Sequence, residues 1–225
     1  PAIMGTLFLV ALALAIALPL GLMSAIYLVE YASKESRLMG WVNSAVYNLN
    51  GVPSIVFGLF GLAFFVKFLG FGTCLLSASL TLTMMILPTI IMTSVEALKT
   101  VPNSFREGSM AMGATKWQTI WKIVIPASFP GVTTGAILAV GRAAGETAPI
   151  LFTGAVYYMR GLPNSIFEPV MALPYHLFVL ATEHPNISAV RPIQFGTALV
   201  LIILVLSFAL VAALIRNHYR KMRKW

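Results

Sequence analysis

Charged residues are scarce in this chain of 225 amino acids: they make up 10% of it, while 59% of the residues are hydrophobic. A soluble domain carries about 25% charged residues. So few charges cannot cover the surface of a domain whose interior is this apolar. The composition therefore excludes an ordinary soluble protein and predicts that lipid surrounds much of the fold.

Cysteine and acidic residues are also few. The single cysteine, Cys74, excludes an intrachain disulfide, and we expect it to be a small buried hydrophobe beside an apolar run. Seven acidic residues against 15 Lys and Arg give a formal charge of +8. A basic chain can indicate nucleic-acid binding. Here, however, the basic residues lie between the apolar runs and in the tail 216–224, which is typical of cytoplasmic loops, and we expect no nucleic-acid partner.

Five apolar runs are long enough to cross a membrane, for which about 20 residues are needed. We therefore predict an all-α membrane protein with about five transmembrane helices in one domain, residues 1–225. A short interfacial helix is expected near 171–181, within a long external loop at about 153–194. The predicted spans cover about 2–28, 52–68, 75–95, 123–152 and 195–215.

The positions of Lys and Arg predict which side of the membrane each connection faces. Most of these residues lie around Lys34 and Arg37, in the segment 99–122, and in the tail. The connections on the other side hold only Lys67, Arg160 and Arg191. This pattern predicts a cytoplasmic C-terminus and an external start of the sequence, and it suggests that one earlier span precedes this sequence.

The fourth run contains glycines spaced four apart and two opposite charges. Gly131 and Gly135, like Gly141 and Gly145, have the spacing that lets another helix approach closely. Arg142 and Glu146 are also four apart, so on one helix they would share a face and pair. A charge at the centre of a bilayer costs about 2.5–3.5 kcal/mol, which predicts that the pair faces the protein interior or an aqueous path.

Two interpretations of this pair remain open. It could be a structural ion pair that holds helices together. Alternatively, the guanidinium could bind an oxyanion through two hydrogen bonds while Glu146 orients it. The hydroxyls of Ser54 and Thr147 could line the same path or only pack between helices.

The polar segment 99–122 predicts a short helix. Ser104 is suited to cap it, with Glu107 as the partner in a capping box, and the helix should end near Gly113 and Ala114. A helix this polar cannot be buried in lipid. We expect it to lie on the membrane or to dock into a partner.

These residues also carry a family resemblance. The segment Glu107-Gly108-Ser109, with Gly113 and the later Ile123-Val124-Ile125-Pro126, resembles the cytoplasmic coupling loop of binding-protein-dependent ABC importer permeases. The common form has Glu-Ala-Ala, so Gly108 and Ser109 replace two alanines. The resemblance implies that Glu107, Gly108, Ser109, Gly113 and Ala114 fit a cleft on an ATPase subunit.

The segment 141–149, Gly-Arg-Ala-Ala-Gly-Glu-Thr-Ala-Pro, is similar to the signature of phosphate ABC permeases of the PstA-like kind, and 25–32 and 53–58 agree. This implies a type I ABC importer permease fold, six spans in the family, and a substrate pathway through Arg142, Glu146, Thr147 and Ser54. It implies a prokaryotic inner membrane, a PstC-like permease partner, two ATPase subunits and an external phosphate-binding protein.

The resemblance implies no nucleotide site on this chain, because ATP and Mg would bind the ATPase subunits. The sequence contains no G-x-x-x-x-G-K-[ST] motif, which agrees with that division of labour. No nucleophile–base arrangement stands out, and His176 and His184 lack metal-ligand spacing, so we expect no catalytic residue and no metal. A permease for another oxyanion, such as sulfate or molybdate, is the alternative. A channel or a membrane enzyme is a more distant one.

Overall fold

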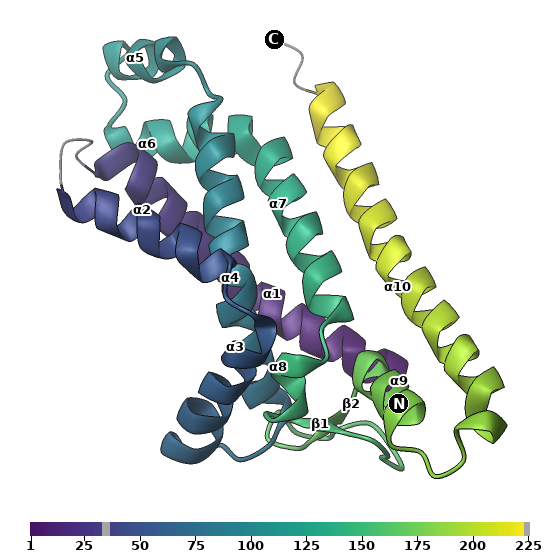
Figure 1. The fold of residues 1–225 in the computed structure, drawn as a ribbon. Coiled ribbons are helices and arrows are strands. Elements are labelled where there is room, and N and C mark those ends of the chain that lie inside the picture. The colour runs from purple at the N-terminus through teal and green to yellow at the C-terminus, as the bar shows by residue number, and fades with distance from the viewer. Residues whose placement is uncertain (33–36, 223–225) are drawn as a thin grey trace.

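The computed structural model describes residues 1–32 and 37–222 and consists almost entirely of helices (Figure 1). Lys34, Arg223 and Lys224, which contributed to the predicted orientation, lie outside the described residues. Four helical stretches are long and apolar enough to cross a membrane, which confirms four of the five predicted spans. They are α1 (Ala2–Ile26) with its π-helical end η1 (Tyr27–Tyr31), α4 (Leu75–Lys99), the continuous α6 (Lys116–Thr119), η3 (Ile120–Val124) and α7 (Ile125–Gly145), and α10 (Ile187–Met222).

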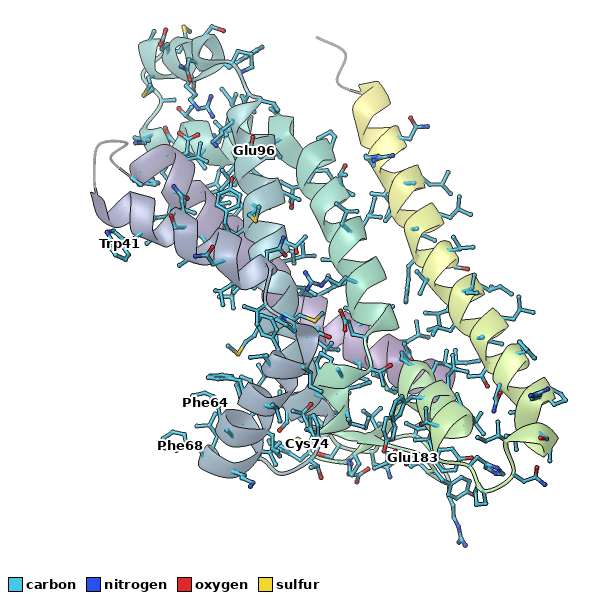
Figure 2. All side chains as sticks on the ribbon, in the orientation of Figure 1. Trp41, Phe64, Phe68, Cys74, Glu96 and Glu183 are labelled. Carbon is cyan, nitrogen blue, oxygen red and sulfur yellow. The ribbon has the colours of Figure 1, made fainter. Side chains whose placement is uncertain are left out.

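The remaining predicted span is one arm of a bent pair. Helix α2 (Arg37–Asn50) meets α3 (Ser54–Gly61) and its π-helical continuation η2 (Leu62–Phe68) at an angle of 101°. The 8 residues of α3 and the 7 of η2 rise only about 22 Å at about 1.5 Å per residue, less than the roughly 30 Å hydrocarbon core. A pair bent by this much is either a broken span or a re-entrant loop, so the remaining predicted span stays a prediction. Phe64 and Phe68 project from it away from the bundle (Figure 2).

The core of the bundle lies where α1, α4 and α7 pack against one another. Its fully buried side chains come mainly from α4, for example Leu82, Met85 and Ile86. The glycine spacing in the fourth run is confirmed in its first half only. A Cβ on Gly131 would lie 2.5 Å from the Cβ of Ala97, and one on Gly135 would lie 2.0 Å from Oγ1 of Thr93, so α7 approaches α4 closely there.

The second glycine pair does not serve this purpose within the described chain. A Cβ on Gly141 or on Gly145 would meet nothing within 4 Å among the described residues, so no described helix of this chain approaches closely there, and an approach by a helix of another subunit stays a prediction. The outermost span is α10, which packs beside α7 and α9 (Figure 1).

The loop between α7 and α10 folds onto the start of α1. It contains α8 (Ala148–Leu151), two short parallel strands, β1 (Ala155–Val156) and β2 (Val170–Met171), and α9 (Leu173–Thr182), which confirms the short helix expected there. The backbone N–H of Leu173 donates to Oγ1 of the buried Thr6 at 2.9 Å. The loop is thereby fixed to the first span.

At the opposite end of the bundle, α5 (Asn103–Ala111) stands beyond the ends of the spans (Figure 1). The predicted capping box of Ser104 and Glu107 is wrong, because the N-cap is Pro102, two residues before Ser104, and no side chain caps the helix. A capping box forms instead at α6, between Thr115 and Gln118. The expected end near Gly113 is confirmed, since this glycine has a φ of +84°, a conformation that other residues rarely adopt.

Candidate functional site

Arg142 and Glu146 lie where the long helix α7 ends. The helix stops at Gly145, one turn before Pro149, which has no N–H to donate to the Gly145 carbonyl. Glu146 is extended, with φ −80° and ψ 131°. The prediction of one continuous helix over 123–152 is therefore wrong, and the chain breaks at the charged residues.

The two charged groups nevertheless pair. Nε of Arg142 lies 3.7 Å from Oε1 of Glu146, and their side chains are 30% and 22% exposed. This distance is within ion-pair range but too long for a hydrogen bond. The pair is thus partly accessible and loosely held, which leaves the guanidinium with donors to spare.

Asn50 is the second partner of Arg142, and the sequence analysis missed it. Its Oδ1 accepts a hydrogen bond from Nη1 of Arg142 at 3.0 Å and another from Oγ1 of Thr89 at 2.8 Å. Asn50 is the last residue of α2, just before the Gly51-Val52-Pro53 bend. A polar side chain between two apolar helical segments was the signal available in the sequence.

This cluster lies near half the depth of the bundle. Thr89 is on the third predicted span, α4, which has 25 residues. At about 1.5 Å per residue, Thr89 lies roughly 21 Å from the start of α4 and roughly 15 Å from its end. Arg142 thus holds a positive charge, flanked by an amide oxygen and a carboxylate, where an unpaired charge would be costly.

The other predicted pathway residues lie close by in sequence and in packing. Ser54 is the first residue of α3, and Thr147 directly precedes α8; both are half-buried. The two helices touch, since a Cβ on Gly58 would lie 2.7 Å from the Ala148 carbonyl oxygen. Within the described part of the chain, neither hydroxyl bonds to Arg142 or Glu146, so their place in a pathway stays a prediction.

The predicted coupling residues form an exposed surface on and after α5. Glu107 and Gly108 are exposed, as are the apolar Met110 (47%) and Met112 (89%). Ser109 faces inward instead: its hydroxyl lies 2.9 Å from that of Thr119 on α6. The serine that replaces the usual alanine therefore fastens α5 to α6, while the docking role of this surface stays a prediction.

A more buried ion pair connects α5 to the first span. Arg106 Nη2 lies 2.9 Å from Oε1 of Glu30, and their side chains are only 14% and 8% exposed. Arg106 also donates to the carbonyl oxygens of Leu98, in the last turn of α4, and of Val101, just after that helix. One guanidinium thus joins α5, the C-terminal end of α4 and the π-helical end of α1.

A bundle with several membrane-crossing helices, a helix break at half depth and a hydrogen-bonded charge at that break has the architecture of a membrane transport protein. The model of the family described as "Binding-protein-dependent transport system inner membrane component" matches residues 17–224. The chain belongs to this family, which confirms the resemblance seen in its coupling loop.

Related proteins support the assignment. The chain is 38% identical over 216 residues to phosphate transport system permease protein PstA 1 of Mycobacterium tuberculosis, covering 96% of this chain and 69% of the relative. It is 33% identical to the PstA protein of Xylella fastidiosa (strain 9a5c), covering 96% and 74%, respectively. It is also 33% identical to the probable ABC transporter permease protein YqgI of Bacillus subtilis, covering 88% and 70%.

Solved structures confirm the predicted type I permease fold. A chain of the inward-facing MetNI methionine ABC transporter superposes with a TM-score of 0.73 at 20% identity, covering 96% of this chain and 92% of the other. A chain of a bacterial alginate importer gives 0.67 at 15% identity, covering 99% and 79%.

Proposed function

We propose that this chain is a permease subunit of an ATP-driven phosphate importer and that Arg142 meets the anion during passage. The observation that carries the proposal is the guanidinium held near half depth by Asn50 and Glu146. Arginine binds tetrahedral oxyanions through two parallel hydrogen bonds. The similarity to PstA permeases supports phosphate as that anion.

The chain would form the pathway with a second, PstC-like permease subunit in a prokaryotic inner membrane. An external phosphate-binding protein would deliver the anion, and two ATPase subunits would hydrolyse ATP, so the chain itself needs no catalytic site or cofactor. In this arrangement α5 faces the cytoplasm, as does the C-terminal end of α10.

Motion of α5 would reach the pathway by two routes. The first is the covalent one through α6 and η3 into α7, which carries Arg142 at its far end. The second is the Glu30–Arg106 pair, which moves α1 together with α5. Alternating access then requires only that α7 shift against α2 and α3 around Arg142.

The deciding experiment is phosphate uptake by the complete complex in liposomes. Arg142→Ala should lower uptake at least about tenfold, since hydrogen bonds to a charged group contribute about 1.5–3 kcal/mol. Arg142→Lys keeps the positive charge but loses the planar guanidinium that makes two parallel hydrogen bonds, so uptake by this variant should remain strongly impaired. Arg160→Ala removes an exposed arginine of the external loop and serves as the matched control.

Near-wild-type uptake by Arg142→Ala would refute the site. A second candidate function, import of another oxyanion, is favoured by the same guanidinium, which binds sulfate and molybdate with similar geometry. Competition decides between them: excess sulfate or molybdate should leave uptake of labelled phosphate unchanged. Strong inhibition by either anion would favour the alternative.

A further inference from the structure

A single amide oxygen joins three helices at the site. Oδ1 of Asn50, at the end of α2, accepts from Thr89 on α4 at 2.8 Å and from Arg142 on α7 at 3.0 Å. Asn50 directly precedes the 101° bend between α2 and α3. It therefore ties this bend to both α4 and α7.

The position of Glu146 decides which edge of the guanidinium an anion can reach. An oxyanion binds arginine bidentately through Nη1 and Nη2 or through Nε and Nη2. Because the Glu146 carboxylate lies 3.7 Å from Nε, its charge repels an anion from that edge. The anion is directed to the Nη1–Nη2 edge, and Nη1 is the atom that Asn50 now holds.

At this edge of the guanidinium, an anion binds more strongly than the amide oxygen of Asn50. Hydrogen bonds between an ionised donor and an ionised acceptor are stronger than those to a neutral amide oxygen, and a fork makes two of them. An amide oxygen and an anion oxygen that share Nη1 also repel each other, so anion binding weakens the bond between Asn50 and Arg142. Thr89 keeps its bond to Asn50, because that bond does not involve the guanidinium.

We propose that Asn50 is a placeholder for the transported oxyanion. It is a positioning residue whose amide oxygen ties α7 to the α2–α3 bend until the anion takes over Nη1. Anion binding then frees α7 from the bend, while the bend stays attached to α4. This inference rests on the proposed function, because it requires Arg142 to meet the anion.

The test compares two substitutions with opposite expected effects in the complete reconstituted complex. Asn50→Ala removes the tie without an anion, so ATP hydrolysis in the absence of the binding protein should rise at least about threefold. Asn50→Asp has the same shape and still accepts from Thr89 and Arg142. Its added negative charge binds the guanidinium more strongly than the amide oxygen does and so competes with the anion. Phosphate uptake should therefore fall at least about tenfold without a rise in ATP hydrolysis.

Asn48→Ala and Asn48→Asp make the same changes on the same helix at an exposed position and should leave both activities unchanged. A merely supporting role for Asn50 gives the reverse pattern: Asn50→Asp transports normally, and Asn50→Ala loses uptake without extra hydrolysis. Either result overturns the placeholder. Asn50→Asp alone decides if Asn50→Ala does not assemble. Arg142→Ala separates the two hypotheses, because its uptake tests the proposed function independently of Asn50.

Discussion

Removing one partner of the Glu30–Arg106 pair should strongly destabilise the fold, and the size of this effect can be tested against a matched pair in the same chain. Replacing Arg106 by Ala leaves the Glu30 carboxylate, whose side chain is 8% exposed, without its partner. It also removes the hydrogen bonds to the Leu98 and Val101 carbonyls. Breaking a buried ion pair from one side costs about 3–5 kcal/mol. At about 2–4 °C per kcal/mol, the melting temperature should fall by roughly 6–20 °C.

The control is the ion pair of Lys99 and Glu96, which has the same 2.9 Å separation but side chains that are 57% and 64% exposed. An exposed pair contributes about 0–1 kcal/mol, so Lys99→Ala should shift the melting temperature by about 4 °C at most. Thermal unfolding of the purified complex, followed by intrinsic fluorescence, gives both values.

A double-mutant cycle isolates the interaction itself. Glu30→Ala combined with Arg106→Ala should be less destabilising than the sum of the two single changes by at least about 1 kcal/mol. Equal shifts for Arg106→Ala and Lys99→Ala would show that burial does not set the strength of these pairs, and the reasoning would fail. Additivity in the cycle would show that Arg106 acts through the carbonyls of Leu98 and Val101 alone.

The remaining predictions concern helix packing and the coupling surface. Gly135→Ala places a Cβ 2.0 Å from Oγ1 of Thr93 and should destabilise the fold by about 1–3 kcal/mol in the same unfolding assay. Gly141→Ala places a Cβ that meets no described residue, so its effect should be neutral or slightly stabilising. Equal effects of the two substitutions would contradict the close α4–α7 contact. Glu107→Ala should abolish retention of the ATPase subunits in a pull-down, while Glu183→Ala, exposed at the opposite end, should not (Figure 2); normal retention by Glu107→Ala would exclude its docking role.

Most of the helical layout could be predicted because apolar length is a local property. Runs such as 75–95 carry their own signal, and the structure extends that one to Leu75–Lys99. The break after Gly145 was harder to foresee, because Pro149 lies four residues beyond it and a membrane helix often tolerates proline. The sequence spacing of Arg142 and Glu146 predicted their pairing correctly but for a helix geometry that does not exist there.

The contacts that complete the site are long-range, and no periodicity reveals them. Asn50 reaches Arg142 across 92 positions, and Glu30 reaches Arg106 across 76. Each depends on where helices end relative to one another, which local patterns do not encode. The more buried charge pair was therefore the one that the sequence analysis did not single out.

The first span is fastened at both ends, and this has a mechanical consequence. At one end Thr6 accepts from Leu173 in the loop between α7 and α10, and at the other Glu30 pairs with Arg106 of α5. Glu30 follows Thr6 by 24 positions, which correspond to about 36 Å of helix at about 1.5 Å per residue. A displacement of the loop at α9 can thus be transmitted along helix α1 to α5 without involving Arg142. Docking of a loaded binding protein at one end of α1 and the state of the ATPase subunits at the other would then be coupled through a helix that the transported anion does not contact.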